Sequence, residues 1–246
     1  MIKQRSRLMA ALATCGLAGT VLVGTAVAQA AVDPNSAVVI NEVYGGGGNN
    51  NAVYTNDFVE LYNKSSAAVP LAGWSLQYAS STGTSFSAAN TLALSGTIPA
   101  NDYFLIKLAA GSNNILDLPT ADLESSTPLL SGTAGKVALV STTAALGSCP
   151  DAGTSCSLKA DVIDFVGWGG ANDYAGTAPA GATTNPTSIS RNGSHANTPD
   201  NAADFTVGAP SPVASAEAGA PPPPPPLTEP KTIAQIQGTG AASPLV

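Results

Sequence analysis

Short runs of alternating apolar and polar residues recur between about residues 38 and 205. In WSLQY, Trp74 and Leu76 share one face of an extended chain, and Ser75 and Gln77 share the other. Clusters of Gly, Asn, Ser, Thr and Pro separate the runs, and no apolar period of 3.6 residues is long enough to indicate a helix. This pattern predicts an all-β sandwich with one core, whose strands lie in AVVINEVY, DFVELYN, GWSLQYA, DYFLIKL, KVALV and VIDFVGW.

The first thirty residues have the pattern of a secretory signal peptide. Three basic residues begin the chain, residues 8–27 are apolar, and two A-x-A sites allow cleavage after Ala28 or Ala30. The apolar stretch is also long enough to span a membrane, so an uncleaved anchor is the alternative. The small residues at the cleavage sites favour removal, and we therefore expect a secreted, extracellular protein with no membrane contact after cleavage.

The charge balance argues against direct binding to nucleic acid. The whole chain has 9 Lys and Arg against 16 Asp and Glu. Removal of the signal peptide takes away three basic residues and no acid, which leaves a net charge near −10. The remaining cations are scattered, whereas binding to phosphates needs several of them in one patch. We expect a monomer whose partner is another protein or the cell envelope.

Two cysteines remain after the signal peptide, Cys149 and Cys156, in CPDAGTSC. A close pair in an exported chain predicts a disulfide. The alternative is a metal site with two cysteine ligands, but the sequence offers no second Cys or His pair to complete four ligands.

The composition changes near the end of the sandwich region, which we place at residues 35–212. Residues 213–230 form a proline-rich linker with six consecutive prolines, a composition that gives a stiff, extended spacer. Binding by a proline-recognising domain is the alternative reading of this segment. Residues 231–246 begin a new apolar run, in KTIAQIQ, which predicts the truncated start of a further domain.

Several separated motifs in order resemble the lamin tail domain family. They are INEV, DFVELYN, LAGWSL, IPANDYFLI, GKVALV, VIDFVGWG and SISRNG, which together span about 175 residues. The resemblance implies an immunoglobulin-like β-sandwich. The motif residues to which we assign structural roles are Glu42, Asp57, Glu60, Asn63, Gly73, Trp74, Asp164, Gly167 and Arg191.

Physical reasoning gives several of these residues a specific role. Trp74 is expected to fill the core, and Gly73 to adopt a backbone conformation that other residues resist. Glu42 and Glu60 are flanked by apolar strand residues, so each carboxylate needs a partner if it points inward. Arg191 is one of the few available cations, and we expect a polar network that fixes strand register. A catalytic carboxylate pair is the alternative, but no third group with a fitting role is visible.

The last residues carry a second resemblance. TIAQIQGTGAASPLV resembles the opening of the OB-like domain in large secreted nucleases, in which a lamin tail domain and a linker precede a catalytic domain of the endonuclease/exonuclease/phosphatase type. The resemblance implies that this chain is the N-terminal accessory or targeting part of such a nuclease. Magnesium is implied only for the absent catalytic domain.

No catalytic machinery is recognisable within the chain itself. His195, the single histidine, lies in a loop without ligand spacing, and we expect a solvated side chain. A spatial triad is not excluded by the sequence, but there is no G-x-S-x-G motif. We assign no catalytic, cofactor or metal residues. Calcium is the one cofactor worth considering, through loop oxygens in residues 49–57 and 198–204, although neither segment matches an EF-hand.

Three readings remain at this stage. The first is a non-catalytic module of an extracellular DNA-degrading nuclease. The second is a stand-alone secreted or cell-surface adhesion module. The third, a secreted hydrolase, would need a nucleophile and a base that the sequence does not reveal.

Overall fold

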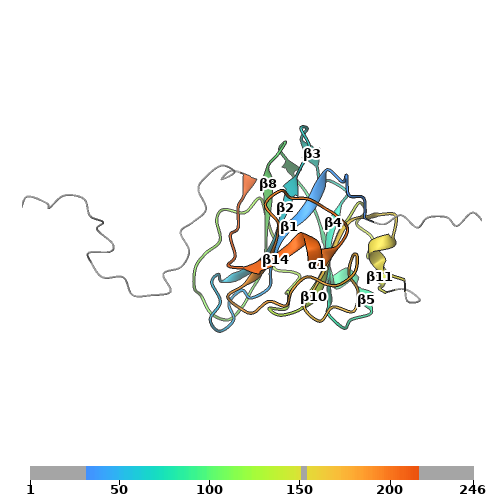
Figure 1. The fold of residues 1–246 in the computed structure, drawn as a ribbon. Helices are drawn as coiled ribbons and strands as arrows, with labels where there is room; N and C mark the ends of the chain where they lie inside the picture. Colours follow the sequence, from blue (N-terminus) through green and yellow to red (C-terminus); the bar gives the residue numbers. More distant parts are fainter. Residues whose placement is uncertain (1–31, 151–153, 216–246) are drawn as a thin grey trace, which may run out of the picture.

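The computed structural model describes residues 32–150 and 154–215 as an all-β sandwich (Figure 1). The expected signal peptide, the proline run and the expected start of an OB-like domain lie outside the described residues. Within those residues no helix is long and apolar enough to cross a membrane.

The larger sheet has six strands in the order β14-β13-β1-β2-β8-β9. Its pairs are antiparallel except for β8 with β9, which run parallel. The strands are β1 (Val38–Tyr44), β2 (Asn56–Asn63), β8 (Tyr103–Ala110), β9 (Leu123–Glu124), β13 (Ser188–Arg191) and β14 (Phe205–Gly208).

The smaller sheet has four antiparallel strands in the order β12-β10-β4-β6. They are β4 (Ser75–Ser80), β6 (Thr91–Ala93), β10 (Gly135–Val140) and β12 (Val162–Trp168). Two further pairs are β3 (Val69–Pro70) with β7 (Thr97–Ile98), and β5 (Ser85–Phe86) with β11 (Gly147–Ser148). The helical elements are short: η1 (Ala88–Asn90), η2 (Cys156–Leu158) and α1 (Asn201–Asp204).

All six expected strands are present, as β1, β2, β4, β8, β10 and β12. Their apolar alternation places one face of each strand in the main core between the two sheets, where Ile40, Leu61, Leu76 and Leu139 are fully buried. Trp74 is only half-buried at the rim of this core, and the fully enclosed tryptophan is Trp168. Trp74 precedes β4 instead of lying in it, so it does not reach between the sheets.

Both sheets are also covered on their outer faces. A second apolar cluster on the smaller sheet includes Ala138, Phe165 and Phe86 together with the two described cysteines. The strands β5 and β11 and the helix η2 lie on this side of the molecule (Figure 1). The polar half of the β4 alternation is therefore not solvated: Ser75 and Gln77 are fully buried and bind backbone oxygens of residues 142–144.

The outer face of the larger sheet carries a third cluster. Tyr44, Phe58 and Leu105 come from β1, β2 and β8, and Ala214 packs onto them from the chain that follows β14. We call residues 209–215 the C-terminal strap. Residues 213–215, which the composition assigned to the linker, thus contact the sandwich.

Candidate functional site

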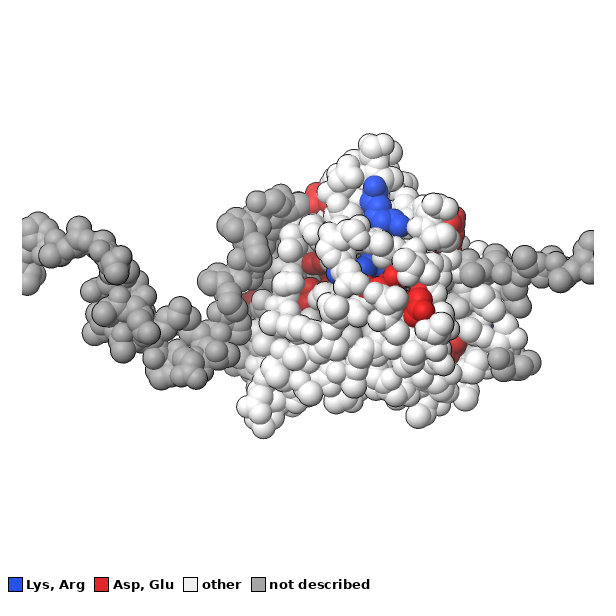
Figure 2. Space-filling model, in the orientation of Figure 1, with Lys and Arg blue, Asp and Glu red and all other residues white. Residues whose placement is uncertain are grey.

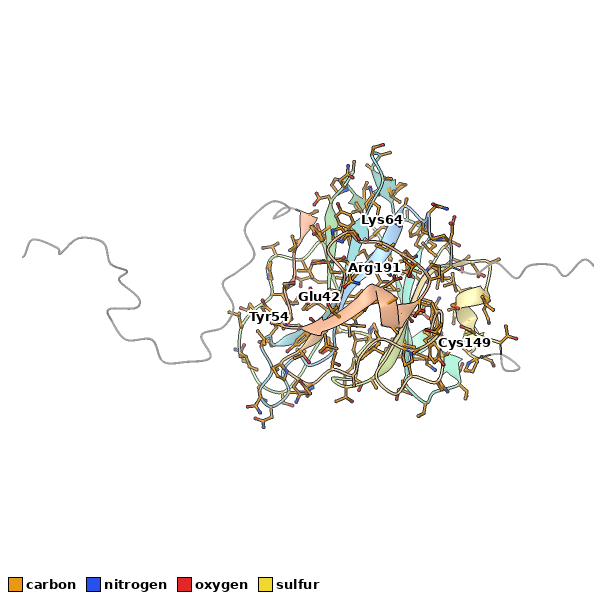
Figure 3. All side chains as sticks on the ribbon, viewed as in Figure 1. Glu42, Tyr54, Lys64, Cys149 and Arg191 are labelled. Atoms are coloured by element: carbon orange, nitrogen blue, oxygen red, sulfur yellow. A yellow bond between two sulfur atoms is a disulfide. The ribbon has the colours of Figure 1, made fainter. Side chains whose placement is uncertain are left out.

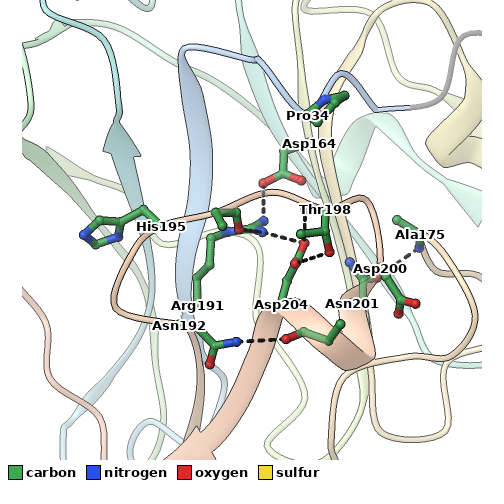
Figure 4. Close-up of polar contacts among 12 residues, drawn as sticks. Pro34, Asp164, Ala175, Arg191, Asn192, His195, Thr198, Asp200, Asn201 and Asp204 are labelled. Atoms are coloured by element: carbon green, nitrogen blue, oxygen red, sulfur yellow. Dashed lines mark hydrogen bonds and ion pairs between the residues drawn. The ribbon is translucent and has the colours of Figure 1, made fainter.

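A buried ion cluster joins the two sheets. The guanidinium of Arg191, on β13, donates from Nη2 to Asp164 Oδ2 at 2.8 Å and from Nη1 to Asp204 Oδ2 at 3.0 Å. Its Nε donates to the carbonyl of Ile40 at 3.0 Å, and the guanidinium carbon lies 4.4 Å from the ring centre of Phe205. Figure 4 shows Arg191 between the two aspartates. The cluster therefore connects β13 and β1 of one sheet to β12 of the other.

The two aspartates also organise the local backbone. Asp164 Oδ2 accepts the amide of Ile40 at 2.7 Å, and Asp204 accepts the amide and hydroxyl of Thr198 at 2.9 and 2.5 Å. Burial raises the pKa of Asp164, and the charge of Arg191 offsets that rise only in part. Arg191, which the sequence offered as one available partner for Glu42 and Glu60, is engaged by Asp164 and Asp204 instead.

Glu42 and Glu60 instead form a pair of neighbouring buried acids on the outer face of the larger sheet. They are direct partners in the β1–β2 ladder, and each is 1% exposed. Among the described residues, no ion pair links either glutamate to a cation. Burial raises the pKa of Glu42, and burial together with the charge of Glu42 raises the pKa of Glu60 well above its usual value.

The C-terminal strap supplies hydrogen bonds to these acids. The amide and hydroxyl of Ser211 donate to Glu42 at 3.0 and 3.1 Å, and the amide of Val213 donates to Glu60 at 2.6 Å. Two residues further, the amide and hydroxyl of Ser215 donate to Asp122. Three carboxylates thus hold alternate residues of one extended segment across the sheet.

Apolar packing completes the strap contact. Ala214 is fully buried against Tyr44, Phe58 and Leu105, and Tyr54 contacts the same cluster. Glu42 and Tyr54 lie near this region of the molecule in Figure 3, on the opposite side from Cys149. The strap covers the acid pair, so the two carboxylates do not line an open site.

His195 belongs to the same network, contrary to the expectation of a solvated side chain. Its Nδ1 lies 2.6 Å from Asn41 Oδ1, and Asn41 Nδ2 donates to Glu60 at 2.6 Å. The imidazole stacks on Tyr62 with 3.7 Å between ring centres, and its Nε2 lies 3.4 Å from the hydroxyl of Tyr103. Burial, Arg191 and Lys64 lower the pKa of His195. A loop histidine is therefore a fixed, half-buried part of the sheet surface.

Asn41 and the strap are the residues that sequence reasoning missed. The ladder register shifts between Ile40 and Glu42, so Asn41 occupies a β-bulge. Two successive polar residues within an apolar strand were the available signal. For the strap, residues 211–215 read SPVAS, which carries no polar and apolar alternation and resembles linker, so the sequence held no comparable signal.

Asp57 and Asn63 organise turns. Asp57 accepts the amides of Gly47 at 2.9 Å and Leu130 at 2.8 Å, and burial raises its pKa to about 7. Asn63 donates to the carbonyls of residues 67, 98 and 99 and accepts the amide and hydroxyl of Ser65. Both residues hold loops at the two ends of β2 and face no solvent cavity.

Gly73 and Gly167 are required for different reasons. Gly73 has φ +89°, which confirms the expected left-handed backbone, and a Cβ there would meet nothing within 4 Å. Gly167 has no space for a side chain, because a Cβ would lie 2.2 Å from the carbonyl oxygen of Asp173. Its amide donates to Asn201 Oδ1 at 2.9 Å, which docks α1 onto β12.

The disulfide between Cys149 and Cys156 is confirmed. A carboxylate oxygen of Asp173 lies within 4.8 Å of both sulfur atoms, but it accepts the amide of Cys156 at 3.0 Å and the sulfurs are bonded to each other. Both cysteines pack in the apolar cluster on the outer face of the smaller sheet.

The loop oxygens considered for calcium already have protein partners. Asp204 binds Arg191 and Thr198, Asp200 accepts the hydroxyl of Thr177 at 2.8 Å, and Asp57 accepts two amides. Calcium binding stays a prediction, and these three aspartates could serve as ligands only by giving up those donors.

Open, concave surface lies elsewhere. A shallow depression of about 350 Å³ at the β8–β9 edge is lined by residues that include Asn56, Lys107, Glu124 and Ser125. It contains neither the acid pair nor His195. On the face that Figure 2 shows, charged atoms are sparse and most of the surface is uncharged.

A family model of the lamin tail domain matches residues 31–170. A search among curated proteins returned no match. The matched region begins before β1 and continues past β12, so it contains the acid pair, Asp57, Asn63 and the disulfide. Because this match covers more than half of the 246 residues, the chain belongs to the lamin tail domain family.

Proposed function

We propose that this chain is a secreted, non-catalytic lamin tail module that forms the N-terminal accessory or targeting part of an extracellular DNA-degrading nuclease. In this proposal the catalytic domain lies outside the 246 residues. The module positions its parent enzyme through contact with a protein or with the cell envelope.

The strap is the observation that carries this proposal. Glu42 and Glu60, the two acids that most resembled a catalytic pair, are covered by residues 209–215 and bind their amides. Their geometry serves attachment of the outgoing chain rather than access by a substrate. A segment anchored by three carboxylates leaves the sandwich from a defined place, which suits a module that carries another domain.

Export is supported by the disulfide. Such bonds persist in oxidising compartments, and Cys149 and Cys156 are joined within the apolar cluster of the smaller sheet. The signal-peptide pattern of the first thirty residues points the same way. Secretion is thus the localisation that the chain's chemistry favours.

The nuclease context is supported by the resemblance of TIAQIQGTGAASPLV and by its position after the proline run. The acidic charge of the module disfavours a direct grip on DNA, so substrate binding would fall to the catalytic domain and its magnesium. A stand-alone adhesion module is the alternative, and the same experiment separates the two.

The test is mass spectrometry of the native protein in the culture medium of the source organism, followed by a DNA hydrolysis assay with magnesium. We expect peptides of residues 31–215 in a species far heavier than the 246-residue chain, and magnesium-dependent hydrolysis by that species. Recombinant residues 31–246 serve as the control and should not cleave DNA.

Two outcomes would contradict the proposal. A native species no heavier than the 246-residue chain would favour the adhesion module. DNA cleavage by the recombinant module, lost on a catalytic-site substitution such as Glu60→Gln, would show that the chain is itself an enzyme.

A further inference from the structure

Lys136 is a buried amine that the proposed function does not use. It lies on β10, between Ala79 of β4 and Gly167 of β12, and it is 0% exposed. Its Nζ is 2.5 Å from the carbonyl oxygen of Gly83 and 2.5 Å from Oδ1 of Asn172. The second contact joins a central strand of the smaller sheet to the loop that follows β12.

The carboxamide of Asn172 is held in this position from several sides. The backbone amide of Asn172 donates to Ser81 at 2.8 Å, and its Nδ2 donates to the carbonyls of Thr82 and Gly83 at 3.3 and 3.4 Å. The next residue, Asp173, accepts the amide of Cys156 and packs over Gly167. The carboxamide of Asn172 is therefore held with its oxygen against the amine of Lys136.

Burial shifts the amine of Lys136 toward its neutral, nucleophilic form. No carboxylate within the described part of the chain forms an ion pair with it. Burial lowers the pKa of Lys136. The negative charge of buried Asp173 raises this pKa, but its effect is the smaller of the two. A desolvated lysine with a lowered pKa is the form of this side chain that attacks carbonyl carbons.

We propose that Lys136 and Asn172 form an intramolecular isopeptide bond. The lone pair of Nζ attacks Cγ of Asn172, and a C–N bond forms between them. The bond from Cγ to Nδ2 breaks, and a proton from Nζ leaves with Nδ2 as ammonia. The side chain of Asn172 is exposed, so ammonia has a path to solvent, and no oxidant or cofactor takes part. The proton passes directly from Nζ to the leaving Nδ2, so the step balances without a further acid or base.

This bond would give the outer face of the smaller sheet a second covalent tie. The disulfide closes residues 149–156, and Asp173 already connects that loop to the segment carrying Asn172. The isopeptide bond would tie the same segment to β10. Such ties limit opening of the fold, which is useful outside the cell, although the inference stands without the nuclease assignment.

The test is a tryptic digest of the reduced, alkylated full chain. With the bond present, trypsin cannot cleave at Lys136, and residues 108–159 remain joined to residues 160–191. The joined species has a mass about 17 Da, one ammonia, below the sum of its two parts. Separate peptides 108–136, 137–159 and 160–191 in the folded wild-type protein would overturn the proposal.

Fragmentation of the joined peptide must place the loss at Lys136 and Asn172. Cyclisation of an N-terminal Gln29 and succinimide formation at Asn192–Gly193 remove the same mass without joining peptides. Lys136→Met and Asn172→Ala should abolish the linked species. Lys159→Met is the matched control, because Lys159 also donates to backbone carbonyls. It removes one tryptic site and should keep the bond, so its digest should give residues 108–191 as one species about 17 Da below the mass of that sequence.

Discussion

Glu42 and Glu60 face each other across the β1–β2 ladder as two buried acids, and within residues 32–150 and 154–215 no cation forms an ion pair with either. Hydrogen bonds from the strap favour their ionised forms, and burial favours their neutral forms. The pair therefore makes the stability of the sandwich depend on pH.

We expect the domain to be more stable near pH 5 than near pH 8. The folded-state pKa values of Glu42 and Glu60 lie above 4.5, and that of Asp57 rises from 3.8 to about 7. A raised pKa contributes stability below the unfolded value, and this contribution is lost as pH rises through the folded value. Thermal melts at several pH values measure this change in stability. His195, with its lowered pKa, acts in the opposite sense at low pH.

Glu42→Gln should raise the free energy of unfolding at pH 8 by about 1 kcal/mol, because it removes one of two like charges directly opposite each other. The difference in the free energy of unfolding between pH 5 and pH 8 should therefore be smaller in this variant than in the wild type. Exposed Glu124→Gln is the control and should leave the profile unchanged. A wild-type melting temperature that climbs steadily from pH 5 to pH 8 would contradict the pKa directions.

The strap should depend on the amide of Val213. Val213→Pro removes this donor and leaves a buried carboxylate oxygen of Glu60 unpaired, at a cost of about 1–3 kcal/mol. Val213→Ala keeps the amide and should cost much less. Hydrogen exchange of residues 211, 213 and 215 reports on the strap directly, and rapid exchange of all three in the wild type would show that it is not held.

Arg191→Met should destabilise the domain by about 3–5 kcal/mol, because it leaves Asp164 and Asp204 buried without their cation. Lys107→Met removes the exposed ion pair with Glu124 and should cost less than about 1 kcal/mol. Urea unfolding of both variants makes the comparison. Equal effects would mean that the buried cluster contributes no more than a surface pair.

Replacing both Cys149 and Cys156 by serine should cost about 2–3 kcal/mol, since the bond closes a short loop and restricts the unfolded chain. Alkylation of the native wild-type protein provides a second measurement. Neither cysteine should react before reduction, and both should react after it. Labelling of either thiol in the native protein would rule out the bond.

The sequence by itself determined the strands and the family. Period-two alternation is a local property, since neighbouring side chains of a strand point to opposite faces, and it located all six main strands. The positive φ of Gly73 and the pairing of Cys149 with Cys156 were also readable from short stretches.

Only the tertiary structure decided the partners of the buried polar groups. Arg191 lies 27 residues from Asp164 and 13 from Asp204, and no local pattern distinguishes these acids from Glu42 or Glu60. The bulge at Asn41, the burial of His195 and the strap all depend on which faces the completed sheets cover. Long-range packing determines these partners, because a buried charge must be paired and only the folded chain decides which groups lie within reach of it.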